Sequence, residues 1–137
     1  MKSILKTGKE SSVVIFITSV LLMSLILSCS DDPVNYPVLV TLPVQDSDIT
    51  SATAKLKAEI TDIGNQKIIE YGIEIYKKTL LVPVEAKGYK TAPVIGTFEV
   101  DFTGLEANTL YYYRAYSLIN TAYYYSENNM QFTTKTK

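Results

Sequence analysis

Cys29 carries the most reactive side chain of this 137-residue sequence, and it is the only cysteine. A single thiol cannot form an internal disulfide or a thiolate zinc site. The sequence also has no histidine, which excludes a Ser-His-Asp triad, an imidazole general base and a metal site built from histidines. The chemistry that remains for Cys29 is modification of its sulfur, and the residues around it indicate which modification to expect.

The segment before Cys29 has the pattern of an export signal. Three lysines precede a nearly unbroken apolar run over residues 13–27, which is typical of a secretory signal peptide and somewhat short for a membrane-spanning helix. The run ends in Ile26-Leu27-Ser28-Cys29, which resembles a bacterial lipobox, where the thiol is acylated and the chain is cut just before it. We therefore expect residues 1–28 to be a lipoprotein signal peptide and Cys29 to be the lipidation site, with palmitate among its acyl chains. A plain signal peptide with an incidental cysteine and an uncleaved anchor are the alternatives.

The residues that follow Cys29 indicate a destination. Ser30-Asp31-Asp32 resembles the export signal of surface lipoproteins in Bacteroidetes-type bacteria. We expect the mature chain to be lipid-anchored in the outer membrane and to face the cell surface, with the periplasmic leaflet as the alternative. Residues 29–36 would form an acidic tether, and residues 37–137 would form the domain.

The charge balance argues against binding along a nucleic-acid backbone. The sequence has 13 basic and 14 acidic side chains, and its first 28 residues hold three lysines and one glutamate. The expected mature chain therefore has ten basic and thirteen acidic groups, a net charge of −3, which offers no electrostatic footprint for phosphates. The expected partners are the membrane, through the lipid anchor, and a glycan or a surface protein, with no nucleic acid.

The segment after residue 36 is patterned as strands. Apolar residues recur with a period of two, and no stretch of ten residues shows a helical stripe. Seven short segments at roughly ten-residue spacing, with polar turns between them, predict an all-β, seven-stranded antiparallel β-sandwich. The expected strands are Val38–Leu42, Ala52–Ile60, Ile68–Tyr76, an edge strand near Leu80–Val84, Thr97–Thr103, Leu110–Ile119 and Tyr123–Thr133.

One of these strands carries a family resemblance. The run from Leu105 through Asn108-Thr109 to Tyr111, continuing into Tyr113-Arg114-Ala115-Tyr116, is similar to the strand F region of bacterial fibronectin type III domains, as is the closing Phe132-Thr133-Thr134. The resemblance implies a fibronectin type III-like domain in which Tyr111 is the tyrosine corner, a stability residue whose hydroxyl bonds to the backbone near Leu105 or Glu106. The sequence departs from the family at Ile119-Asn120-Thr121-Ala122, where a glycine is usual in the turn.

Eleven tyrosines are the compositional anomaly of this chain. Strand alternation places Tyr112, Arg114 and Tyr116 on the outer face of their strand, beside Glu70, Glu74 and Tyr76 of the strand expected next to it. Exposed aromatic rings with polar neighbours suit both sugar rings and protein partners. We therefore expect ligand binding by Tyr76, Tyr112, Arg114 and Tyr116. The alternative is that cross-strand tyrosine pairs only stabilise the sheet.

No pattern in the sequence predicts an enzyme, a metal site or a cofactor. Asp46-x-Asp48 offers two carboxylates, whereas calcium takes six to eight oxygens, so these residues predict a turn. Glu70 and Glu74 would lie about 13 Å apart along one strand, beyond the roughly 5–9.5 Å between paired glycosidase carboxylates. The leading hypothesis is a non-catalytic envelope protein that binds a glycan or protein. A structural spacer or assembly subunit of a surface complex is the alternative.

Overall fold

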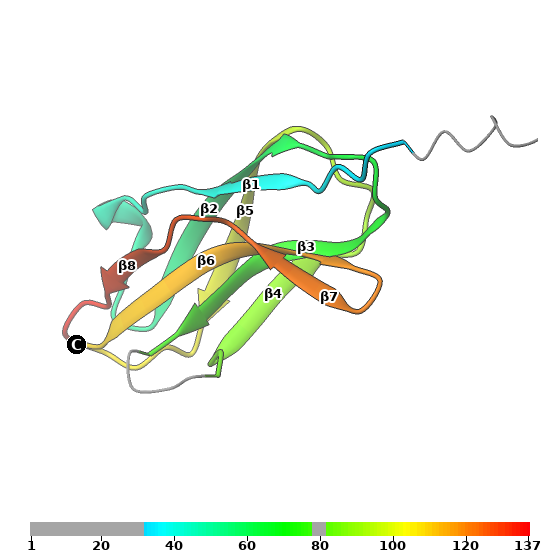
Figure 1. Ribbon diagram of the computed structural model, residues 1–137. Coiled ribbons are helices and arrows are strands. Elements are labelled where there is room, and N and C mark those ends of the chain that lie inside the picture. Colours follow the sequence, from blue (N-terminus) through cyan, green and yellow to red (C-terminus); the bar gives the residue numbers. More distant parts are fainter. Residues whose placement is uncertain (1–31, 78–81) are drawn as a thin grey trace, which may run out of the picture. The chain divides into compact units, whose positions relative to one another are not determined.

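The computed structural model describes residues 32–77 and 82–137, and these form an antiparallel β-sandwich of two sheets (Figure 1). The smaller sheet has the strand order β1-β2-β5, with β1 (Val38–Thr41), β2 (Thr53–Asp62) and β5 (Gly96–Thr103). The larger sheet has the order β4-β3-β6-β7, and β8 pairs with the other half of β6. Its strands are β3 (Ile68–Tyr76), β4 (Glu85–Tyr89), β6 (Leu110–Ile119), β7 (Ala122–Tyr125) and β8 (Met130–Thr133). No helix in the described ranges is long and apolar enough to span a membrane.

The core lies between the two sheets, where the alternating apolar residues meet. On β2 the alternate residues from Ala54 to Ile60 are at most 1% exposed, and on β3 Ile73 and Ile75 are fully buried. Burial of each large aliphatic side chain contributes about 1.5–3 kcal/mol, so these residues fix the register of their strands. The all-β sandwich predicted from the sequence is confirmed.

The tyrosine corner is also present. The Tyr111 side chain is 2% exposed, and its hydroxyl oxygen accepts a hydrogen bond from the Glu106 backbone N–H at 3.0 Å. In the turn between β6 and β7, where the resembling family has glycine, Asn120 adopts a left-handed conformation with φ of 55°. Asparagine is one of the few residues that tolerate this region, so the turn forms without glycine.

The described residues form eight strands where seven were expected, because the last predicted strand, Tyr123–Thr133, is broken into β7 and β8. Asn128 lies between β7 and β8 and bonds to β1. Its Oδ1 accepts a hydrogen bond from the Thr41 N–H at 3.0 Å, and its Nδ2 donates one to the Thr41 carbonyl at 2.6 Å. The Thr41 hydroxyl accepts from the Ala115 N–H at 2.9 Å and lies 2.6 Å from the Ser126 hydroxyl. We call this set, Thr41, Ala115, Ser126 and Asn128, the Thr41 clamp. The Thr41 side chain of the smaller sheet thus bonds to the larger sheet at the break between β7 and β8.

The edge strand of the larger sheet lies later in the chain than the sequence predicted. Residues 80 and 81 of the predicted strand lie outside the described residues, while Val82 and Val84 are exposed and precede β4. Pro83 cannot donate to a ladder, whereas Gly88 pairs with Gly72 of β3. A Cβ on Gly88 would lie 2.5 Å from the Tyr71 carbonyl oxygen, so the two strands approach where neither residue has a side chain.

Residues Val34–Lys137 form one compact unit. Tyr36, which was expected in the tether, stacks on Tyr124 with ring centroids 4.5 Å apart.

Candidate binding face

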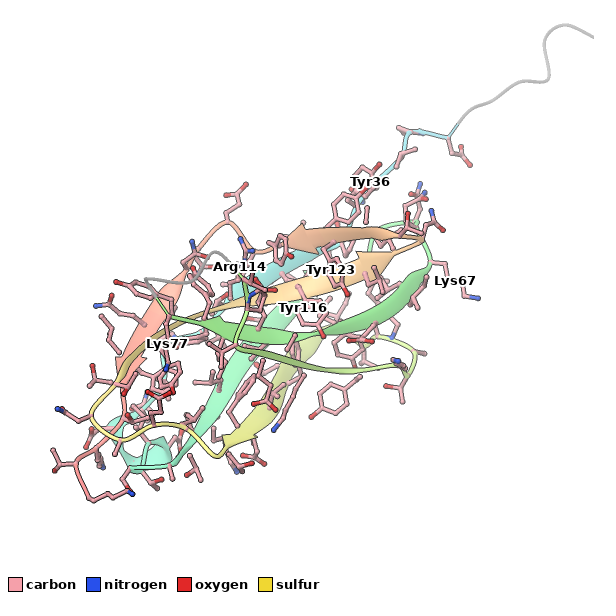
Figure 2. All side chains as sticks on the ribbon, turned by 90° about the horizontal axis from the view of Figure 1, so that it is seen from below. Tyr36, Lys67, Lys77, Arg114, Tyr116 and Tyr123 are labelled. Carbon is pink, nitrogen blue, oxygen red and sulfur yellow. The ribbon has the colours of Figure 1, made fainter. Side chains whose placement is uncertain are left out.

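Five tyrosines lie on the outer surface of the larger sheet. Antiparallel pairing sets Glu74 opposite Arg114 and Tyr76 opposite Tyr112, and sets Tyr116 opposite Tyr125 of β7. We call this surface the tyrosine face. It comprises Tyr76, Tyr112, Arg114, Tyr116, Tyr123 and Tyr125, and Figure 2 shows Arg114, Tyr116 and Tyr123 among the strands of this sheet.

Arg114 lies at the centre of the tyrosine face and is held from two sides. Its Nε donates to Glu74 Oε1 at 2.7 Å, and its guanidinium carbon lies 3.5 Å from the centroid of the Tyr125 ring. The Glu74 side chain is only 4% exposed, against 31% for Arg114. A buried carboxylate needs such a partner because removing it from water is costly, so Arg114 both neutralises Glu74 and holds the Tyr125 ring.

Tyr116 differs from the prediction, because it is 1% exposed rather than open to solvent. Its hydroxyl donates to Glu70 Oε1 at 2.6 Å, and the Tyr123 ring packs edge-on against it at 5.6 Å. Gly88 leaves room for its hydroxyl, because a Cβ on Gly88 would lie 2.7 Å from that oxygen. Gly72, which pairs with Tyr116 on β3, also carries no side chain. Tyr116 therefore faces outward as alternation requires, yet it is covered by its neighbours and forms the floor of the face.

The environment of Tyr116 also changes its acidity. Burial raises the pKa of the Tyr116 hydroxyl above its ordinary value of 10.0, and the Glu70 carboxylate that accepts its hydrogen bond raises this pKa further. Tyr125 has a raised pKa as well, first through burial and then through the charge of Glu74. Both hydroxyls therefore stay protonated at neutral pH, and that of Tyr116 donates a hydrogen bond to Glu70.

The other predicted side chains lie together at the surface. Tyr76 and Tyr112 are half-buried and stack on each other with ring centroids 5.7 Å apart and an interplanar angle of 19°. Arg114 lies 5.9 Å from the Tyr76 ring. Three of the four predicted residues, Tyr76, Tyr112 and Arg114, are thus adjacent and partly exposed.

Two residues of the face were not singled out from the sequence. Tyr123 and Tyr125 are 53% and 39% exposed, and their rings stack 6.2 Å apart with an interplanar angle of 14°. The turn at Asn120-Thr121 was the signal that could have found them, because a tight hairpin there aligns residues 123 and 125 with the outward residues of β6.

A surface hollow of about 370 Å³ lies beside Tyr125, between β1 and the break that separates β7 from β8. The volume is within the range of small-ligand sites. The hollow presents an aromatic ring, a carboxylate, an amide and apolar side chains, and its lining includes Val38, Val40, Tyr125, Glu127 and Asn128. In the described ranges no group of three histidine, cysteine or acidic residues is placed to hold a metal ion.

Comparison with known proteins supports the architecture. No family model matches the chain, and no curated protein does. Among solved structures, the chain is similar to the sensor domain of the anti-sigma factor RsgI4 of Pseudobacteroides cellulosolvens. A long form of that domain gives a TM-score of 0.57 at 14% identity, over 74% of this chain and 91% of the other. Its solution structure gives 0.55 at 14% identity, over 73% and 76%. At such identities the likeness shows a shared fold.

Proposed function

We propose that this chain is a lipid-anchored, non-catalytic protein of the bacterial cell envelope, with a fibronectin type III-like domain that binds a glycan or a protein partner through the tyrosine face. The observation that carries the proposal is the fixed geometry of that face. Tyr76, Tyr112, Tyr123 and Tyr125 expose parts of their rings while stacking and Arg114 hold them in place. Rings that are ordered before binding lose little conformational entropy on contact with a ligand.

The carboxylates of the face support binding rather than catalysis. Glu74 is paired with Arg114, and Glu70 accepts a hydrogen bond from the Tyr116 hydroxyl while the Lys90 ammonium lies 3.6 Å away. A general acid or a nucleophile needs access to substrate, and both carboxylates are engaged within the sheet. The fold likeness to a sensor domain agrees with a binding role.

A structural spacer or assembly subunit is the second candidate function. The stacking and ion pairing of the face would also stabilise a sheet that binds nothing. The exposure of Tyr123 and Tyr125, at 53% and 39%, favours the binding role, because a spacer needs no exposed aromatic rings.

The proposal is tested with Tyr112→Ala combined with Tyr125→Ala. The probes are an array of bacterial and plant glycans and a pull-down of surface proteins from the producing cells. The double variant should lose about tenfold or more in affinity for whatever the unmodified domain binds, because aromatic contact residues carry a large share of binding energy. Its circular dichroism and unfolding midpoint establish that it is folded.

Tyr89→Ala is the matched control. Tyr89 is 41% exposed, similar to Tyr125, but its hydroxyl bonds to the Glu99 carbonyl at the edge between the sheets, outside the tyrosine face. Unchanged affinity in the double variant, or absence of binding to every probe by the unmodified domain, would favour the spacer.

A further inference from the structure

One end of the sandwich gathers four chain segments, and we call it the N-proximal end. The segments are the lead-in at residues 34–37, the β2–β3 turn at 63–67, the β4–β5 connection at 90–95 and the β6–β7 turn at 120–121. Strand register brings them to the same end, since Val38 pairs with Asp62, Ile60 with Gly96 and Ile119 with Ala122. Figure 1 shows these turns opposite the end that holds the C-terminus.

Several large apolar side chains are exposed at the N-proximal end. Val94 and Ile95 are 74% and 60% exposed, although both are large aliphatic residues. Val34, Val38 and Ile69 are also exposed there, by 41% or more. Single exposed apolar residues are ordinary, whereas a group of them at one end of a small domain is a candidate interaction site.

Amphipathic and basic side chains surround these apolar residues. Tyr36 and Tyr123 are 44% and 53% exposed at the rim, where Figure 2 shows them at the same end as Lys67. The Lys90 side chain is 79% exposed. Exposed aliphatic residues ringed by tyrosine and lysine form the composition that settles at the boundary between lipid headgroups and acyl chains.

The opposite end of the domain also exposes apolar residues, among them Val82, Val84 and Leu110. Its exposed carboxylates at Asp46 and Glu106 are ion-paired with Lys135 and Lys77. What distinguishes the N-proximal end is its place in the chain, because it includes Val34, five residues after Cys29.

We propose that the N-proximal end is a membrane-contacting surface, with Val94 and Ile95 inserted at the lipid interface. The inference rests on the proposed lipid anchor at Cys29. Five residue steps separate Cys29 from Val34, and a fully extended chain spans at most about 3.6 Å per residue, so Val34 stays within about 18 Å of the anchored cysteine. The partner is a phospholipid surface. The contact would fix the orientation of the tyrosine face relative to the membrane plane.

The test uses the absence of tryptophan from the sequence. Val94→Trp introduces a single fluorescent reporter into the full chain, which is purified from membranes and placed in vesicles of phosphatidylethanolamine and phosphatidylglycerol, with and without brominated acyl chains. Val84→Trp is the matched control, because Val84 is 45% exposed at the opposite end. We expect the tryptophan at position 94 to be blue-shifted and quenched by bromine, and the tryptophan at position 84 to be neither.

The outcomes separate this inference from the proposed anchor, which is measured on the same samples by the mass of Cys29. An acylated protein in which both tryptophans escape quenching overturns the membrane contact and leaves the anchor in place. For a protein without acyl chains, sedimentation with the same vesicles and quenching at position 94 alone would support the contact although the anchor is absent. An unacylated protein that does not sediment with vesicles overturns both.

Discussion

At the scale of single residues, Tyr116 is the buried member of the tyrosine face. Its hydroxyl makes the stability of the domain fall as the pH rises into the alkaline range. Its pKa is raised in the folded state above the ordinary 10.0 by burial and by Glu70. Above pH 10 the unfolded chain therefore releases this proton first, so the unfolded state is favoured and the free energy of unfolding falls as the pH rises. Well below pH 10 both the folded and the unfolded states keep this proton, so Tyr116 no longer makes the free energy of unfolding depend on pH.

The Tyr116→Phe variant should lack this part of the pH dependence. Urea unfolding at about pH 8 and about pH 11 should show a smaller loss of stability in the variant than in the unmodified domain. At the lower pH the variant should be less stable by about 1–2 kcal/mol, because Glu70 loses a hydrogen bond from a buried donor. Tyr113 and Tyr125 also have raised pKa values and act equally in both proteins. An equal pH slope in the two proteins would contradict the assignment.

Sequence reasoning placed Tyr111 and Tyr116 on the correct faces of β6. Of these two residues it predicted burial only for Tyr111, whereas Tyr116 is buried as well. Strand alternation states which face a side chain is on, and a motif of known geometry supplied the Tyr111 hydrogen bond. The covering of Tyr116 depends on Gly72 and Gly88 standing side by side. Their pairing could not be predicted because the edge strand that carries Gly88 was expected earlier in the chain.

At the scale of elements, the Thr41 clamp joins β1 of the smaller sheet to the larger sheet. Thr41→Val keeps the side-chain volume but removes the hydroxyl that accepts from Ala115 and bonds Ser126. Because Thr41 is 1% exposed, these groups lose a buried partner, and we expect the variant to be less stable by about 1–3 kcal/mol. Chemical denaturation measures the change.

Thr103→Val is the control for this prediction, since Thr103 is exposed at the end of β5 and should change stability by less than about 0.5 kcal/mol. Amide exchange should also quicken in β1 of the Thr41 variant, and protection equal to that of the unmodified domain would show that the clamp does not hold the strand.

The elements predicted best from the sequence are those with an uninterrupted period of two. Ile68–Tyr76 and Leu110–Ile119 begin and end where the pattern does. The break after Tyr125 was missed because its cause is not local: Asn128 bonds to Thr41, which lies 87 residues earlier. A polar residue within a strand pattern gives no sign that its side-chain amide bonds to backbone groups far away in the sequence.

At the scale of the whole molecule, the proposed anchor predicts the mass of the mature protein. Protein isolated from bacterial membranes should begin at Cys29 and carry the added mass of acyl chains on that residue, because its thiol is the only one in the chain. Cys29→Ser should abolish the added mass and move the protein out of the membrane fraction. Finding residues 1–28 still attached to the membrane-bound chain would contradict the prediction.

The Thr41 clamp also has a mechanical consequence. The proposed anchor lies before β1 in the chain, so tension on it reaches the domain through β1 and its hydrogen bonds to β2. β1 has only four residues, yet at its far end both backbone groups and the hydroxyl of Thr41 are bonded. Pulling β1 out of the domain would therefore have to break bonds to both sheets together.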